Sequence, residues 1–183
     1  AAIVAQAKKV VAIEKDRKLY RFLAERYGTR SDLELIHSDA LDLSLADILA
    51  DGVSKMVSNL PYSVASRILV EIFKSESKPE RIVVTLQADV AERIAAAPDC
   101  KEYGMLAILA QRFYDIEIVR KISPNCFLPR PRVESALLVC RRRNLPLARV
   151  SDEDFFLRVV KMAFTHRRKI LVNALRASGF ATE

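Results

Sequence analysis

Short runs of aliphatic and β-branched residues alternate with helical patterns through most of this sequence. Four such runs are VVAIE at Val10–Glu14, LELIH at Leu33–His37, KMVS at residues 55–58 and RIVVTLQ at Arg81–Gln87. The first run lacks polar alternation, which is typical of a strand that is buried on both faces of a parallel sheet. Because a helical segment follows each run, the alternation predicts an α/β fold with a doubly wound sheet.

The helix after the first run has a predicted cap and a predicted inner face. Asp16 can accept hydrogen bonds from N–H groups of the first turn, and Gly28 stands near the helix end. Four apolar residues recur at helical spacing, and we expect them to face the core: Leu19, Phe22, Leu23 and Tyr27.

The pattern changes in the last third of the chain. Residues 115–120 (DIEIVR) and 133–140 (VESALLVC) alternate like an antiparallel pair of strands, and the proline-rich loop PNCFLPRPR at residues 124–132 joins them. A polar link and two further helical patterns follow. The sequence therefore predicts one α/β domain over residues 1–143 and the start of a small helical domain over residues 144–183.

Positive charge is concentrated in the C-terminal part of the chain. Residues 1–119 hold 16 Lys+Arg and 18 Asp+Glu, a net charge of −2, whereas residues 120–183 hold 14 and 5, a net charge of +9. This asymmetry favours a polyanionic partner, most simply a nucleic acid. The alternative is a solvated charged face without a partner.

The cysteines and the hydropathy pattern exclude several classes of protein. Cys100, Cys126 and Cys140 are an odd set without C-x-x-C spacing, so we expect free thiols in a reducing cytoplasm and neither a disulfide framework nor a metal site. No run of 18 apolar residues is present, so we expect no membrane partner.

Polar residues follow three of the predicted strands. Glu14 ends the first, Asp39 follows the second, and NLPY at residues 59–62 follows the third. In open α/β sheets, ligands bind outside the carboxyl ends of the strands. Glu14 could accept from two ribose hydroxyls, and Asp39 could accept from an exocyclic amine such as adenine N6. The alternatives are a helix N-terminal charge for Glu14 and a cap or turn residue for Asp39.

The NLPY turn combines an amide, a proline and an aromatic ring. Asn59 offers an amide oxygen, and Pro61 lacks an N–H, so the carbonyl of Leu60 need not be tied into a regular turn. Tyr62 presents a flat face on which a base could stack. Two acceptors and a stacking face suit a planar ring that bears an amino group. The alternative is a strand-end turn packed by Tyr62.

The proline-rich loop and the basic clusters could complete a nucleic-acid site. Phe127 is either a core anchor or a second stacking face for a base. Arg130 and Arg132 flank it and could contact phosphates. The cluster Arg167, Arg168 and Lys169 begins a predicted helix, where cations oppose the helix dipole. A phosphate partner would explain that conflict, and so would an acidic neighbour in the fold.

The chain resembles the ribosomal RNA adenine N6,N6-dimethyltransferases, which modify two adjacent adenosines near the 3′ end of small-subunit RNA. The matching pieces cover most of the chain in order: VVAIEKD, IHSDAL, VSNLPYSVASRIL, VVTLQADVAERI, EYGMLAILAQ, PNCFLPRPRVESALL and FTHRRKILVNAL. The resemblance implies a Rossmann-like class I methyltransferase sheet over residues 1–143 and S-adenosylmethionine as the methyl donor. It further implies a monomeric cytoplasmic enzyme that acts on the immature small ribosomal subunit.

The resemblance also implies roles for individual residues. The cofactor would be bound by Glu14 on its ribose, by Asp39 on its adenine amine, by Ala40 and by Asn59. The target adenine, flipped out or unpaired, would be held by the catalytic set Asn59, Leu60, Pro61, Tyr62 and Phe127. Catalysis would rest mainly on positioning.

The sequence departs from the family pattern in three places. The family's first strand and Gly-rich loop precede VVAIE, and none of the four glycines here (Gly28, Gly52, Gly104 and Gly179) forms that loop. Gln87-Ala88-Asp89 stands where the family often has Gln-Lys-Glu, and the terminal helical domain is short. We therefore expect a portion of a longer enzyme.

Two other classes of enzyme share the turn: large-subunit RNA methyltransferases of the antibiotic-resistance type, and methyltransferases of DNA adenine or protein glutamine. A third alternative is a non-catalytic module that docks on ribosomal RNA or on a transcription complex.

Overall fold

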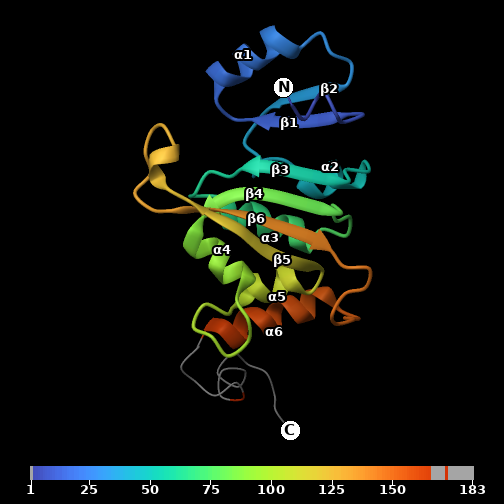
Figure 1. Ribbon diagram of the computed structural model, residues 1–183. Coiled ribbons are helices and arrows are strands. Elements are labelled where there is room, and N and C mark those ends of the chain that lie inside the picture. Colours follow the sequence, from blue (N-terminus) through green and yellow to red (C-terminus); the bar gives the residue numbers. More distant parts are fainter. Residues whose placement is uncertain (1, 166–171, 173–183) are drawn as a thin grey trace.

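The computed structural model describes residues 2–165 and residue 172, and these residues form two β-sheets with helices around them (Figure 1). The smaller sheet pairs β1 (Val10–Glu14) with β2 (Leu33–His37). The larger sheet has the order β3-β4-β6-β5, with bounds Lys55–Asn59, Arg81–Gln87, Ser135–Arg142 and Tyr114–Ile122. The pairs β1–β2 and β3–β4 are parallel, as the alternation predicts.

Helices connect most of these strands along the chain, and one helix follows the last strand. Their bounds are α1 Arg17–Tyr27, α2 Leu45–Ala50, α3 Ala65–Lys74, α4 Ala88–Ala95, α5 Met105–Gln111 and α6 Glu153–Thr165, and η1 is a 3₁₀ turn at Pro124–Cys126. Figure 1 shows α3, α4 and α5 on the same side of the larger sheet. The main core is therefore enclosed between this sheet and these three helices.

Strand β4 forms the centre of that core. Its alternate residues Ile82, Val84 and Leu86 are fully buried, which is the period-two pattern of a strand with one covered face. Tyr114 is also fully buried, and its hydroxyl donates a hydrogen bond of 3.0 Å to the carbonyl oxygen of Pro79. That bond removes the cost of burying an unpaired hydroxyl.

The late strands form the predicted antiparallel pair. β6 pairs with β5 on one side and antiparallel to β4 on the other, so the pair extends the edge of the sheet. A register shift lies between Ile118 and Arg120. The sequence predicted this edge because polar and apolar residues alternate there.

In the part of the chain that the structure describes, the strands form two hydrogen-bonded groups, β1–β2 and β3-β4-β6-β5. Among the described residues, β1 pairs only with β2, and β3 pairs with β4 alone. Figure 1 shows the smaller sheet beyond the β3 edge of the larger one. Val57 of β3 is correspondingly exposed.

Helix α1 confirms its predicted cap but not its predicted inner face. Asp16 Oδ1 accepts from the backbone N–H groups of Lys18 and Leu19, each at 2.8 Å. Leu19 and Phe22, however, are 54% and 52% exposed, so their prediction as core residues is wrong. The residues of β1 are also half-buried rather than buried on both faces. Within residues 2–165 and residue 172, the contacts of α1 are mainly with β1 and β2.

An ion pair between the buried Arg112 and the exposed Glu153 attaches α6 to the end of α5. Arg112 is 7% exposed, and its two terminal nitrogens donate to the carboxylate of Glu153, each at 2.7 Å. Its Nε donates to the carbonyl oxygen of Ala148 at 3.0 Å, and its guanidinium lies over the rings of Phe113 and Phe156. The hydrogen bond from Arg112 lowers the pKa of Glu153.

Candidate active site

The turn after β3 leaves polar groups free at the end of a well-anchored strand. The N–H of Leu60 donates to the carbonyl oxygen of Thr85 at 3.0 Å and holds this residue in the core. The carbonyl oxygen of Pro61 accepts from Val64 and Ala65 and so begins α3 at once. Asn59 is exposed. Within the described part of the chain, its side chain and the carbonyl oxygen of Leu60 have no hydrogen-bond partner.

The proline-rich loop has a fixed local structure. Ser123 Oγ accepts from the N–H of Asn125 at 3.3 Å, and the N–H of Phe127 donates to the carbonyl oxygen of Pro124 at 3.2 Å. These bonds form the 3₁₀ turn η1. Phe127 follows it and is half-buried.

The turn and the loop face each other across one open pocket of about 350 Å³. The turn contributes Asn59, Leu60, Pro61 and Tyr62, and the loop contributes Phe127, Leu128, Pro129 and Pro131. The five residues that the sequence predicts for the catalytic set therefore line the same pocket. Its volume lies in the range of small-ligand sites.

One hydrogen bond joins the turn to the start of β6, just after the proline-rich loop. The hydroxyl of Tyr62 lies 2.5 Å from Oγ of Ser135, which is fully buried at the start of β6. The neighbouring carbonyl of Glu134 accepts from the N–H of Ala88 at 3.0 Å. Ser135 was not predicted from the sequence, because a serine in an alternating strand carries no signal of a partner 73 residues away.

Glu14 and Asp39 lie at the carboxyl ends of β1 and β2. Glu14 Oε1 accepts from the N–H of Asp16 at 2.7 Å, and Glu14 is opposite His37 in the parallel register. Asp39 accepts from the N–H of Leu41 at 3.0 Å and from Nζ of Lys15 at 2.6 Å. Both bonds lower the pKa of Asp39, and the bond from the backbone N–H of Leu41 has the larger effect. Both carboxylates thus lie at one edge of the smaller sheet, as predicted.

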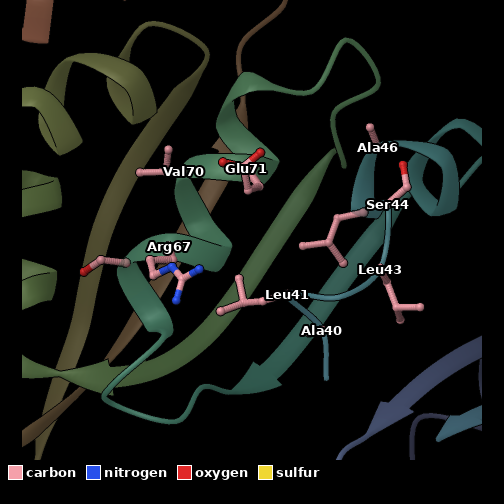
Figure 2. A pocket seen from close by; sticks show the side chains of 10 residues that line it. Ala40, Leu41, Leu43, Ser44, Ala46, Arg67, Val70 and Glu71 are labelled. Atoms are coloured by element: carbon pink, nitrogen blue, oxygen red, sulfur yellow. The ribbon is translucent and has the colours of Figure 1, made fainter. Parts of the chain in front are cut away.

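A larger pocket of about 440 Å³ lies between α3 and the segment before α2 (Figure 2). Ala40 is the one predicted cofactor residue that lines it. Arg67 and Glu71, one turn apart on α3, are its charged residues, and the rest of its wall is mainly leucine, alanine, valine and serine. It shares no lining residue with the pocket at Asn59.

The basic residues that are discussed for RNA binding differ in their partners. Arg130 and Arg132 are exposed and have no ion-pair partner within residues 2–165 and residue 172. Arg141 and Arg143 instead pair with Glu117 and Asp115 across the β5–β6 pair. The predicted RNA-binding residues Arg167, Arg168 and Lys169 lie outside the described residues.

A family model for "Ribosomal RNA adenine dimethylase" matches residues 1–182. The chain belongs to this family. The resemblance read from the sequence is thereby confirmed.

In the described residues, no helix has the length and apolar character needed to cross a membrane.

The sequences of curated relatives in the family are similar to nearly the whole of this chain. "Ribosomal RNA small subunit methyltransferase A" of Clostridium perfringens (strain SM101 / Type A) is 41% identical over 175 residues, which are 95% of this chain and 61% of the relative. The protein of the same name from Clostridium botulinum (strain Loch Maree / Type A3) is 40% identical over 176 residues, 96% of this chain and 64% of the relative. The chain thus spans slightly more than three fifths of their length.

Two solved structures of low sequence identity share the fold. A dimethyladenosine transferase from Plasmodium falciparum matches with a TM-score of 0.81 at 21% identity, over 96% of this chain and 62% of that one. The 23S rRNA methyltransferase ErmE matches with a TM-score of 0.68 at 22% identity, over 96% of this chain and 69% of that one. The predicted class I methyltransferase fold is confirmed.

Proposed function

We propose that this chain carries the catalytic cleft of an enzyme that transfers methyl groups from S-adenosylmethionine to N6 of two adjacent adenosines in small-subunit ribosomal RNA, as a step in ribosome maturation. Family membership and the names of the Clostridium relatives support this function. The observation that carries it is the pocket in which the turn at Asn59 meets the loop at Phe127.

The pocket offers what an adenine base requires. The side-chain oxygen of Asn59 and the carbonyl oxygen of Leu60 can both accept from the exocyclic amine, because neither has a partner in the described part of the chain. The rings of Tyr62 and Phe127 come from opposite walls and can stack on the base. With its two hydrogens engaged, the amine loses conjugation with the ring and its lone pair becomes nucleophilic.

Glu14 and Asp39, at the carboxyl ends of the strands of the smaller sheet, can bind the nucleoside part of the cofactor. S-adenosylmethionine supplies an electrophilic methyl group on a sulfonium. Glu14 keeps Oε2 for ribose hydroxyls, since Oε1 is bound to the N–H of Asp16. Asp39, held ionised by its hydrogen bonds, is placed to accept from the adenine amine once Lys15 turns away, and Lys15 is exposed enough to do so.

Catalysis by these residues is a matter of positioning. Asn59 and the Leu60 carbonyl orient the amine, and the two aromatic rings exclude water from the faces of the base. No general base is needed, because the methylated nitrogen can release its proton to water.

A methyl-transfer assay tests the proposal. The full-length protein is incubated with tritiated S-adenosylmethionine and either immature small subunits or large-subunit RNA. Label in two adjacent adenosines of the small-subunit RNA is expected. Label in large-subunit RNA would overturn the substrate, and tight RNA binding without any label would favour a non-catalytic module.

We also propose that the partner is ribosomal RNA in an immature small subunit and that the protein acts as a monomer in the cytoplasm. A helical RNA-contacting domain would begin near residue 144. Arg167, Arg168 and Lys169 are assigned to RNA affinity, so replacing all three is expected to flatten the salt dependence of binding.

The loop arginines are expected to contact phosphates. Replacing Arg130 and Arg132 together by alanine should lower the slope of log affinity against log salt by about 1.5 to 2, because each phosphate contact releases counterions. Anisotropy titrations with labelled RNA at several salt concentrations measure this slope. The matched control replaces Arg30 and Arg141, which are held in ion pairs with Asp32 and Glu117. An equal loss of slope in the control would contradict the assignment.

The hydrogen bond between Tyr62 and Ser135 is expected to fix the position of the Tyr62 ring in the pocket. Tyr62→Phe and Ser135→Ala should each slow transfer by about fivefold, and the double variant should be no slower, because both remove the same bond. Single-turnover rates measure this coupling, with Tyr27→Phe on α1 as the control. Multiplicative losses would show that the two hydroxyls act independently.

A further inference from the structure

Leu128 is an apolar side chain in an unusual position. It is 100% exposed, although it follows the half-buried Phe127 directly and lines the pocket at Asn59. Burying a leucine is favourable, so a fully exposed one at the rim of a binding pocket has no stabilising role in the described residues.

The loop presents this side chain on a stiff support. The turn η1 precedes it, with Ser123 as its cap. Pro129 and Pro131 follow it and fix two backbone φ angles. The Tyr62–Ser135 bond ties the opposite wall to the start of β6, just after the loop. A side chain held in this way can press on a partner without being displaced.

The surroundings of Leu128 favour a nucleic acid over an apolar protein surface. Arg130 and Arg132 are exposed on the same loop and have no carboxylate partner among the described residues. An apolar tip beside unpaired cations matches the pattern of side chains that enter a base stack while arginines hold the phosphates.

We infer that Leu128 is a wedge that inserts beside the target adenosine and takes the place of its neighbour in the stack, so that the target base stays in the pocket. This inference rests on the proposed function and deepens it, since it assigns a positioning residue for bases that must leave a helix or a stacked loop. Stacked bases cannot otherwise reach the groups at Asn59.

The first test compares two RNAs that share the target nucleotides, one with the adenosines stacked in a hairpin and one without secondary structure. The loss caused by Leu128→Ala in the full-length protein is expected to be about tenfold greater on the hairpin, because only the hairpin requires unstacking. Leu128→Met, which keeps an apolar side chain of similar length, should restore most of the difference. Leu145→Ala is the matched control, because Leu145 is 69% exposed and lies on the link between β6 and α6.

The second test does not depend on catalysis. 2-Aminopurine at the target position lacks the N6 amine and fluoresces more strongly when it leaves the stack. Full-length protein should raise this fluorescence, and Leu128→Ala should lower the rise at saturating protein. Equal effects of Leu128→Ala on both RNAs, with an unchanged fluorescence rise, would overturn the wedge and leave the proposed function intact. A wild-type protein that methylates neither of these RNAs and no immature small subunits would overturn both.

Discussion

Replacing Asn59 by alanine in the full-length protein is expected to reduce methyl transfer by about a thousandfold or more, while RNA affinity stays within about twofold. The side chain is exposed in the pocket and has no hydrogen-bond partner in the described part of the chain, so its removal takes one acceptor from the amine without breaking a contact of the fold. Single-turnover rates at saturating cofactor and RNA measure the effect.

Asn144→Ala is the matched control for this variant. Asn144 is exposed on the link after β6 and lines neither pocket, so its replacement should leave the transfer rate near that of the wild type. Thermal melts of both variants separate catalysis from stability. Transfer by Asn59→Ala within a few-fold of the wild-type rate would remove the turn from the chemistry.

Replacing Glu153 by glutamine is expected to lower the free energy of unfolding by about 1 to 2 kcal/mol, because it leaves the buried Arg112 without its counter-charge, while the 58% exposure of Glu153 lets water screen the pair. The midpoint of thermal unfolding should fall by about 2 to 8 °C. The same substitution at Glu117 is the control, since Glu117 also pairs with an arginine, Arg141, but both side chains are half exposed. That control should cost less than about 1 kcal/mol.

The difference between wild type and Glu153→Gln should depend on pH. The pKa of Glu153 is lowered in the folded state, so its stabilising contribution is present above the ordinary glutamate range and is lost as the pH falls through the lowered value. Denaturant unfolding should therefore show the full difference at neutral pH and a shrinking one below about pH 4. A difference of constant size down to pH 2 would show that the charge is not its cause.

Local patterns predicted most of the elements and the pocket. β1, β2 and β4 have the predicted bounds, because a short run rich in aliphatic residues between polar ones marks a strand without help from distant contacts. The turn at Asn59 and the loop at Phe127 could be related because each carries an unusual combination of amide, proline and aromatic residues.

Long-range partners could not be predicted in the same way. The pairs Arg112–Glu153 and Tyr62–Ser135 join residues 41 and 73 positions apart, and neither residue in a pair indicates the other. Helical spacing also could not reveal that Leu19 and Phe22 are about half exposed in the described structure. Spacing shows which residues share a face of a helix, but whether other segments cover that face depends on long-range packing.

The ladder between β3 and β4 ties the turn at Asn59 to the strands that lead to the other wall of the pocket. The N–H of Leu60 continues this ladder to the carbonyl oxygen of Thr85, and Thr85 is opposite Leu137 of β6 in the register. Backbone ladders hold neighbouring strands about 4.8 Å apart, and β6 begins just after the loop that carries Phe127. A substitution that shifts β4 is therefore expected to move both walls of the pocket together.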